Sequence, residues 1–151
     1  MNHKMNYRNL LIMIAFSFIS MYILMYAMVN VMGNVYNNWN QVYMAALMTA
    51  PMVVIELLVM GAMYPNKQRN ALIISAAVIA GLAFFAFIRQ QTLISDKQFL
   101  RSMIPHHAGA ILMCEQASLT DPEIQQLYQA IISNQQVEID QMRSLLAELE
   151  K

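Results

Sequence analysis

The chain has 151 residues, of which 58% are hydrophobic and only 12% are charged. Soluble domains average roughly 45–50% apolar and about 25% charged residues, so part of this chain is expected to lie in lipid. The net charge of zero argues against nucleic acid as a partner, because phosphate binding needs a surplus of Lys and Arg. A single cysteine excludes an intrachain disulfide.

Three apolar segments are long enough to cross a bilayer, for which a helix needs about 20 residues. They are residues 10–32, 43–64 and 71–88. The first resembles a secretory signal because Lys4 and Arg8 precede it. Its apolar run is too long for a signal, however, and no small-residue cleavage site follows. The sequence therefore predicts a three-span membrane domain over residues 1–90.

The positively charged residues predict how these spans are oriented. Lys4 and Arg8 precede the first span, Lys67 and Arg69 lie between the second and third, and the remaining loop has no charge. Cytoplasmic loops carry the excess of Lys and Arg. We therefore expect a cytoplasmic N-terminus and an extracytoplasmic region after the third span.

Residues 91–151 read as two helices. The first is expected over residues 96–117, with Ser95 as N-cap and Gln98 reaching back to it in a capping box. Pro105 lies inside this helix and is expected to kink or divide it, because proline lacks a backbone donor.

The second helix is expected to begin in "TDPE", with Thr120 or Asp121 as N-cap and Pro122 in the first turn. The short connection predicts an antiparallel hairpin that places position 135 opposite about position 103. A coiled-coil-like seam follows from spacings of three and four. Its predicted members are Ile131, Gln135, Glu138, Met142, Leu145 and Leu149.

Five possible metal ligands fall on about a third of the circumference of the first helix, at about 100° per residue. They are Met103, His106, His107, Met113 and Cys114. Thioether, imidazole and thiol donors suit Cu(I) better than hard cations. The alternative is that the methionines are core residues and the histidines are satisfied by hydrogen bonds.

Two polar residues interrupt the predicted apolar seam of the second helix. Gln135 and Glu138 lie there, followed by Met142, and a buried carboxylate is costly unless it is paired or holds a metal. These residues could be metal ligands, could orient the histidine rings as acceptors, or could fix the register of the hairpin. Zinc is a second candidate metal, because His, Cys and Glu also suit it.

The stretches "FLRSMIPHHAGAILM" and "IISNQQVEIDQM" resemble the bacterial family catalogued as domain of unknown function 305, over about residues 92–148. The resemblance implies a small ferritin-like helical fold associated with copper handling outside the cytoplasm. The three preceding spans resemble those of a membrane-anchored subgroup. Two positions depart from the family pattern: Ala108 stands where Gln is common, and Cys114 where a small residue is usual. The positions that the resemblance marks for metal binding are Met103, His106, His107, Met113, Gln135, Glu138 and Met142.

The membrane segments contain two further candidates. Glu56 lies near the middle of the second span, where a charge costs about 2.5–3.5 kcal/mol on insertion scales. We expect it to face the interior of the bundle, protonated, paired with a Tyr or Asn, or on an ion path. Methionines repeat at spacings of 4, 3 and 4 in the first span, either as a thioether ladder for Cu(I) or as pliable packing. They are Met21, Met25, Met28 and Met32.

These observations predict an all-α protein of a bacterial inner (plasma) membrane, with three spans and a helical hairpin over residues 91–151. The hairpin would bind copper, without catalysis, for tolerance, storage or delivery. A second copy would complete a four-helix bundle, and a copper transporter or chaperone is a possible partner. One alternative is a structural or sensory partner of a transporter that binds no metal. A metal-dependent oxidase is less favoured, because Gln141 rather than His follows three residues after Glu138.

Overall fold

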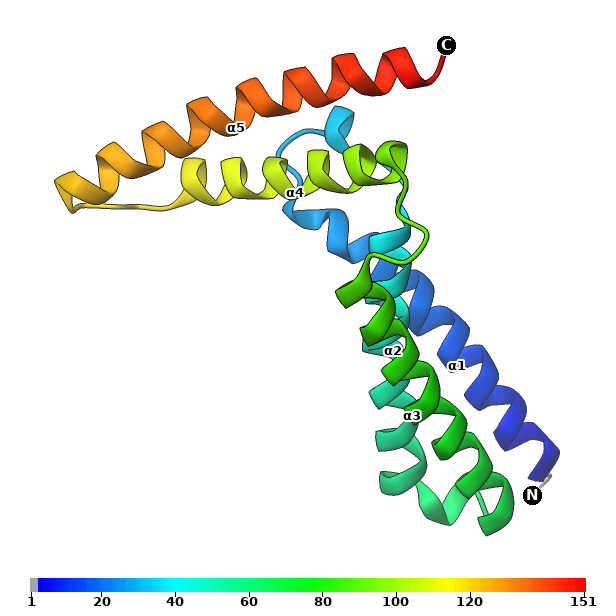
Figure 1. Ribbon diagram of the computed structural model, residues 1–151. Coiled ribbons are helices and arrows are strands. Elements are labelled where there is room, and N and C mark those ends of the chain that lie inside the picture. The colour runs from blue at the N-terminus through cyan, green and yellow to red at the C-terminus, as the bar shows by residue number, and fades with distance from the viewer. Residues whose placement is uncertain (1–2) are drawn as a thin grey trace. The chain divides into compact units, whose positions relative to one another are not determined.

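The computed structural model describes residues 3–151, with side chains from residue 6 onward, and in this range it is helical without strands. Figure 1 labels the five α-helices, and short 3₁₀ turns, here called η, lie between α1 and α2 and between α2 and α3. The elements are α1 (His3–Leu24), η1 (Met25–Met28), η2 (Met32–Asn34), α2 (Trp39–Val59), η3 (Gly61–Met63), α3 (Lys67–Gln90), α4 (Asp96–Gln116) and α5 (Pro122–Leu149).

The chain divides into two compact units. The apolar unit combines the chain up to Leu24 with Asn40–Thr92, and the amphipathic unit combines Met25–Trp39 with Leu93–Lys151. The amphipathic unit therefore contains not only α4 and α5 but also the segment that joins α1 to α2.

Three helices are long enough and apolar enough to cross a membrane, as the sequence predicts. Their bounds differ from the predicted ones. The first covers Asn6–Met28, the second Trp39–Val59 and the third Lys67–Gln90.

The first apolar run leaves the helical path before Met32. The side-chain oxygen of Asn30 accepts bonds from the backbone N–H of Val31 and the side-chain nitrogen of Asn34, both at 2.9 Å. An asparagine that bonds to nearby backbone in this way competes with helical hydrogen bonding. The chain consequently turns after η1.

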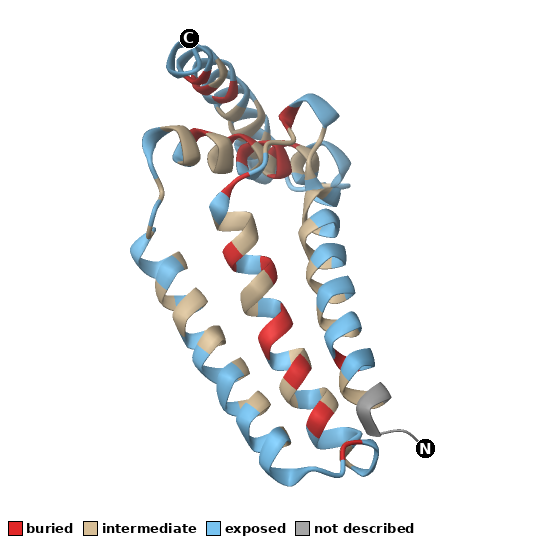
Figure 2. Cartoon of the chain, turned by 90° about the vertical axis from the view of Figure 1, so that its right-hand side faces the viewer, coloured by how far each residue is buried: buried red, intermediate tan, exposed pale blue. Residues whose placement is uncertain are grey.

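The apolar unit has a small core and a large exposed apolar surface (Figure 2). Leu10 of α1, Val53 and Leu57 of α2, and Tyr64 form a buried cluster. No residue of α3 is buried, although this helix is the most hydrophobic of the three spans. The side chains that a water-soluble bundle would cover are therefore left facing outward.

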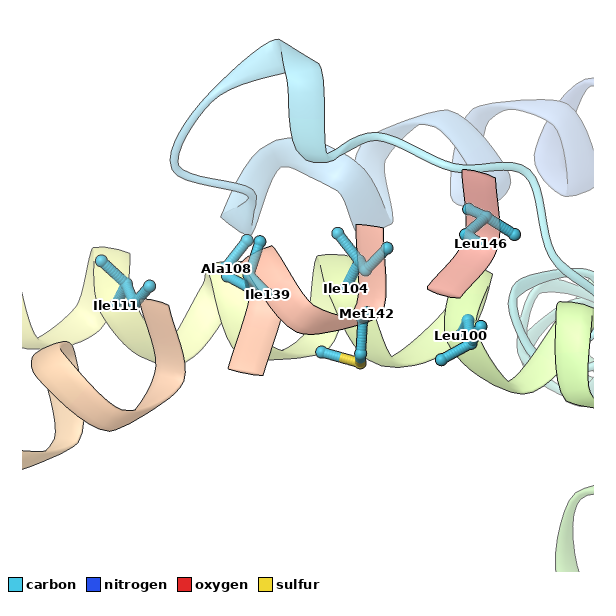
Figure 3. Close-up of a cluster of buried hydrophobic side chains, with 7 residues drawn as sticks. All are labelled: Leu100, Ile104, Ala108, Ile111, Ile139, Met142 and Leu146. Atoms are coloured by element: carbon cyan, nitrogen blue, oxygen red, sulfur yellow. The ribbon is translucent and has the colours of Figure 1, made fainter. Parts of the chain in front are cut away.

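The amphipathic unit is built around α4 and α5, which lie side by side (Figure 1). Glu150, just after α5, binds both Lys97 and Arg101 near the start of α4, so the two helices run in opposite directions. Their shared core consists of Leu100, Ile104, Ala108, Ile111, Ile139, Met142 and Leu146 (Figure 3).

The predicted seam of α5 is wrong at half of its positions. Ile131 and Gln135 are half-buried and Met142 is buried, but Glu138, Leu145 and Leu149 are exposed. Ile139 and Leu146 are buried in their place, and Ile132 packs against the same core. Spacings of three and four residues are present, but Ile132, Ile139 and Leu146 each lie one residue after the predicted position.

The predicted helix starts are largely confirmed. The side chain of Ser95 accepts the N–H of Gln98, and that of Asp121 accepts the N–H groups of Glu123 and Ile124. The return half of the capping box is absent among these contacts, because the side-chain oxygen of Gln98 accepts the N–H of Trp39 at 3.0 Å.

Pro105 does not divide α4, which runs without a break to Gln116. Proline at 105 leaves the carbonyl of Arg101 without its usual helical donor. The side-chain nitrogen of the buried Asn38 lies 3.4 Å from this carbonyl and donates to it. A residue of the segment between α1 and α2 thus replaces the missing donor.

The same segment is held against α5. The side-chain oxygen of buried Asn34 accepts a bond from Arg143 at 2.6 Å, and Val29 and Tyr36 pack against the α4–α5 core. These contacts explain why Met25–Trp39 belongs to the amphipathic unit.

Candidate metal centre

His107 is the buried polar residue at the centre of α4. Its ring atom Nδ1 lies 3.0 Å from the carbonyl oxygen of Met103, one turn earlier. Its other ring nitrogen, Nε2, lies 2.6 Å from a carboxylate oxygen of Glu138 on α5. The Glu138 side chain is 55% exposed, so the pair sits at the edge of the core with its carboxylate in contact with solvent.

The contact with Met103 fixes the orientation of the His107 ring. A carbonyl oxygen can only accept, so Nδ1 carries the proton and donates it. Histidines that bind metals commonly donate one ring N–H in this way, which leaves the second nitrogen to face the ion. In this structure the second nitrogen faces the carboxylate of Glu138.

The register of the two helices differs from the predicted one by about two turns. Placing position 135 opposite 103 would put Glu138 near Leu100, whereas it contacts His107. Residues 117–121, between α4 and α5, are not helical, and both Ala117 and Asp121 are extended. Extended chain advances about 3.3 Å per residue against about 1.5 Å in a helix. More residues of α5 are therefore needed to return to a given level of α4.

Two thioethers and one amide lie in the same part of the unit. Met142 is buried in the α4–α5 core and Met103 packs against that core. The side-chain oxygen of Gln135 is buried and has no hydrogen-bond partner in the described part of the chain. Met103 and Met142 therefore lie against the α4–α5 core, and His107 contacts Glu138 across the same pair of helices.

The other three predicted ligands lie apart from this core. His106 and Met113 are exposed, and Cys114 is half-buried as a free thiol. The rings of His106 and His107 have centroids 6.2 Å apart, but His106 has no hydrogen bond or ion pair to any described residue. The predicted single ligand face is thus divided between the interior and the surface.

Among the described residues, no three His, Cys, Asp or Glu side chains come close enough together to hold one metal ion. A site that used His107 and Glu138 would need further ligands of another kind, and the nearest soft donors on α4 and α5 are the thioethers of Met103 and Met142.

Glu56, the acidic candidate of the second span, is half-buried on α2. It accepts a hydrogen bond from the hydroxyl of Tyr64 at 3.2 Å. The pairing with a tyrosine agrees with one of the predicted alternatives, but Glu56 lies near the end of the span Trp39–Val59 and not near its middle as predicted.

Asn38 and Arg143 contribute to the site region although the sequence does not single them out. Asn38 completes the backbone of α4 two residues before Met103, and Arg143 ties the connecting segment to α5. Pro105 signals that the carbonyl of Arg101 needs another donor, but nothing in the local sequence identifies Asn38.

The family described as Domain of unknown function (DUF305) matches residues 28–146. The chain belongs to the DUF305 family. This confirms the resemblance and extends it, because the DUF305 match begins at Met28 and includes α2 and α3. An uncharacterized protein of Acanthamoeba polyphaga mimivirus is 36% identical over 147 residues, which cover 95% of each chain. No solved structure matches this DUF305 chain.

Proposed function

We propose that this DUF305 chain is a membrane-anchored copper-binding protein that takes up Cu(I) at His107. Met103 and Met142 would supply soft sulfur donors, and Glu138 would supply an oxygen at the Nε2 side of the ring. The observation that supports this proposal is the bond from His107 Nδ1 to the Met103 carbonyl, since it orients Nε2 as in metal-binding histidines. Copper tolerance, storage or delivery would follow, with a transporter or chaperone as the exchange partner.

The test is Cu(I) binding by the full chain in detergent under reducing conditions, in competition with a chromophoric Cu(I) chelator and with Zn(II). We expect His107→Asn and Glu138→Gln to weaken binding. Glu115→Gln is the matched control, because Glu115 is an exposed acid on α4. Equal affinity in all four proteins would refute the proposed site, and preference for Zn(II) would refute the choice of metal.

We place the three apolar helices in a bacterial inner membrane, with the N-terminus in the cytoplasm and α4 and α5 outside it. The distribution of Lys and Arg supports this orientation. Cys114, the only cysteine, should then react with a membrane-impermeant maleimide in intact cells. If only a membrane-permeant maleimide labelled Cys114, the orientation would be the opposite of the proposed one. The Cys114→Ser variant measures the background labelling.

A second copy of the chain is the partner that best fits the outer surface of the α4–α5 pair. A groove of about 280 Å³ lies between the helices and includes the exposed side chains of Phe99, Leu145 and Leu149. Two helices alone cannot enclose such a surface, whereas two pairs form a four-helix bundle. Light scattering of the detergent-solubilised chain should give a dimer, which Leu145→Glu should dissociate.

The second candidate function is docking to a membrane transporter without metal. It is favoured by the fact that both nitrogens of His107 already contact protein atoms. In that case His107→Asn should lower stability, and the wild-type chain should bind no Cu(I).

A further inference from the structure

The apolar unit carries a group of basic side chains at one end of its helices. Arg8 of α1 and Lys67 and Arg69 of α3 are exposed, and none of them forms an ion pair with any residue that the structure describes. The unit has a single acidic residue, Glu56, whose carboxylate accepts a hydrogen bond from the hydroxyl of Tyr64. Basic charge therefore exceeds acidic charge at this end of the unit.

Two contacts hold the start of α1 against the start of α3. The hydroxyl of Tyr7 donates to the side-chain oxygen of Asn70 at 2.7 Å. The guanidinium carbon of Arg69 lies 5.9 Å from the centre of the Tyr7 ring. Since Arg8 follows Tyr7 directly, the cations of the two helices lie at the same end of the unit (Figure 2).

The two cations of α3 are not offset by their own helix. Lys67 is the first residue of α3 and Arg69 the third, and this first turn contains no acidic residue. The positive end of the helix dipole stabilises acidic side chains in the first turn and disfavours basic ones. Arg89, in the last turn of the same helix, has the favourable placement. An anion bound beside Lys67 and Arg69 would supply the negative charge that the first turn lacks.

In the proposed membrane placement, these cations lie at the depth of the lipid headgroups. Two of the three candidate spans, those of α1 and α3, begin at this end of the unit. Tyr7 and Tyr64, whose ring centroids are 5.4 Å apart, belong to a residue type that is enriched at the membrane–water interface. Leu11 and Leu72, slightly further along the same two helices, are exposed and offer apolar surface to acyl chains.

We propose that Arg8, Lys67 and Arg69 form a binding site for the phosphate headgroup of an anionic phospholipid. Clusters of Lys and Arg beside membrane helices recognise such headgroups, and each cation contributes about fivefold in affinity. Tyr7 links the two helices that carry the cations, so the charges have a defined arrangement. The inference does not depend on copper binding, and it rests on the placement of the three apolar helices in a membrane.

The test is native mass spectrometry of the full chain in detergent, with equal amounts of phosphatidylglycerol and phosphatidylcholine that carry the same acyl chains. We expect the wild type to retain phosphatidylglycerol preferentially. Arg8→Gln should lower this preference about fivefold, and replacing all three cations with Gln should abolish it. A micelle has no inside or outside, so any role of the cations in orienting the chain does not affect the result.

Arg89→Gln is the matched control, because Arg89 is an exposed cation at the opposite end of α3. It should leave the lipid preference unchanged. Tyr7→Phe keeps every charge but removes the hydrogen bond to Asn70, and it should lower the preference at least about twofold. Circular dichroism verifies that each variant remains helical.

Four results would overturn the inference. Equal retention of the two lipids, or retention of neither, would remove the site. An equal loss of preference in Arg8→Gln and Arg89→Gln would show that the position of the cation does not matter, and an unchanged preference in Tyr7→Phe would show that charge alone accounts for binding. Displacement of phosphatidylglycerol by an equimolar amount of inorganic phosphate would make the ligand a free anion. The experiment contains no metal, so these results leave the proposed copper site untested and intact.

Discussion

The two units bury their helices in different ways. In the apolar unit α3 has no buried residue, whereas in the amphipathic unit α4 buries six. Their charges differ as well. Of the nine acidic residues, Glu56 lies in the apolar unit, and the other eight, from Asp96 onward, lie in the amphipathic unit. A helix that exposes leucine, isoleucine and phenylalanine all round is matched to lipid, and a helix with one apolar stripe is matched to water on its other side. The burial of a side chain within the chain therefore indicates its contribution to stability only in the unit that is surrounded by water.

The largest contrast should come from the same substitution in each unit. Ile139 on α5 is 0% exposed and Ile79 on α3 is 67% exposed. Ile139→Ala should lower the free energy of unfolding by about 2–5 kcal/mol through the lost contacts and the cavity. Ile79→Ala should change it by less than about 0.5 kcal/mol. Thermal unfolding in detergent, followed by Trp39 fluorescence and by helical circular dichroism, measures both.

A similar loss from Ile79→Ala would break the comparison, since it would mean that α3 packs against protein at this position. Val137→Ala on α5 provides the control for an exposed side chain in water, at 65% exposure.

A charge should reverse the order of sensitivity. Ile79→Lys should disfavour insertion of α3 by about 2.5–3.5 kcal/mol, the cost of a lysine at the centre of a span. Val137→Lys, at nearly equal exposure, should have little effect. Glycosylation of an acceptor sequence added after Lys151, during translation into microsomes, reports whether α3 has crossed. Equal glycosylation of the two variants would argue that α3 does not lie in lipid.

The segment Met25–Trp39 offers a third way to sharpen the comparison, because it follows an apolar helix but packs with α4 and α5. Arg143→Ala removes the bond to buried Asn34 and should cost about 1.5–3 kcal/mol, the range for hydrogen bonds to charged groups. Amide hydrogen exchange should accelerate around residues 30–36. Arg89→Ala, which removes a cation from the last turn of α3, should leave that exchange unchanged.

The parts of the fold that the sequence predicts correctly depend on local signals. Long apolar runs identify the three spans, and Ser95 and Asp121 mark helix starts because their side chains bond within the next few residues. The seam of α5 is not local. Leu145 and Leu146 offer alternative apolar positions one residue apart, and only the partner helix decides between them.

The candidate site shows the same limit. The sequence identifies His107 and Glu138 as interesting residues, but their contact depends on a register that the extended connection sets. The grouping of His106 with His107 rests on an angle around one helix, which cannot reveal that Met28 of η1 lies close to α4 at Gly109. Contacts made by Met25–Trp39 lie far from α4 in sequence, and no spacing rule reaches them.

The smallest expected effect concerns the ion pairs that Glu150 makes with Lys97 and Arg101, where α5 ends beside the start of α4. The hydrogen bond from Arg101, and then that from Lys97, hold the pKa of Glu150 below its ordinary value of 4.5. A carboxyl group with a depressed folded-state pKa stabilises the fold above its unfolded pKa and loses that contribution as the pH falls through the folded value. Glu150→Gln should therefore be slightly less stable than the wild type at pH 7, and the difference should vanish in acid below pH 4.5. Because the side chain is 40% exposed, solvent screens the interaction and high salt should also remove the difference. A difference that persists in acid would show that Glu150 acts through packing. Glu148→Gln, two residues before Glu150, controls for the loss of an exposed acid.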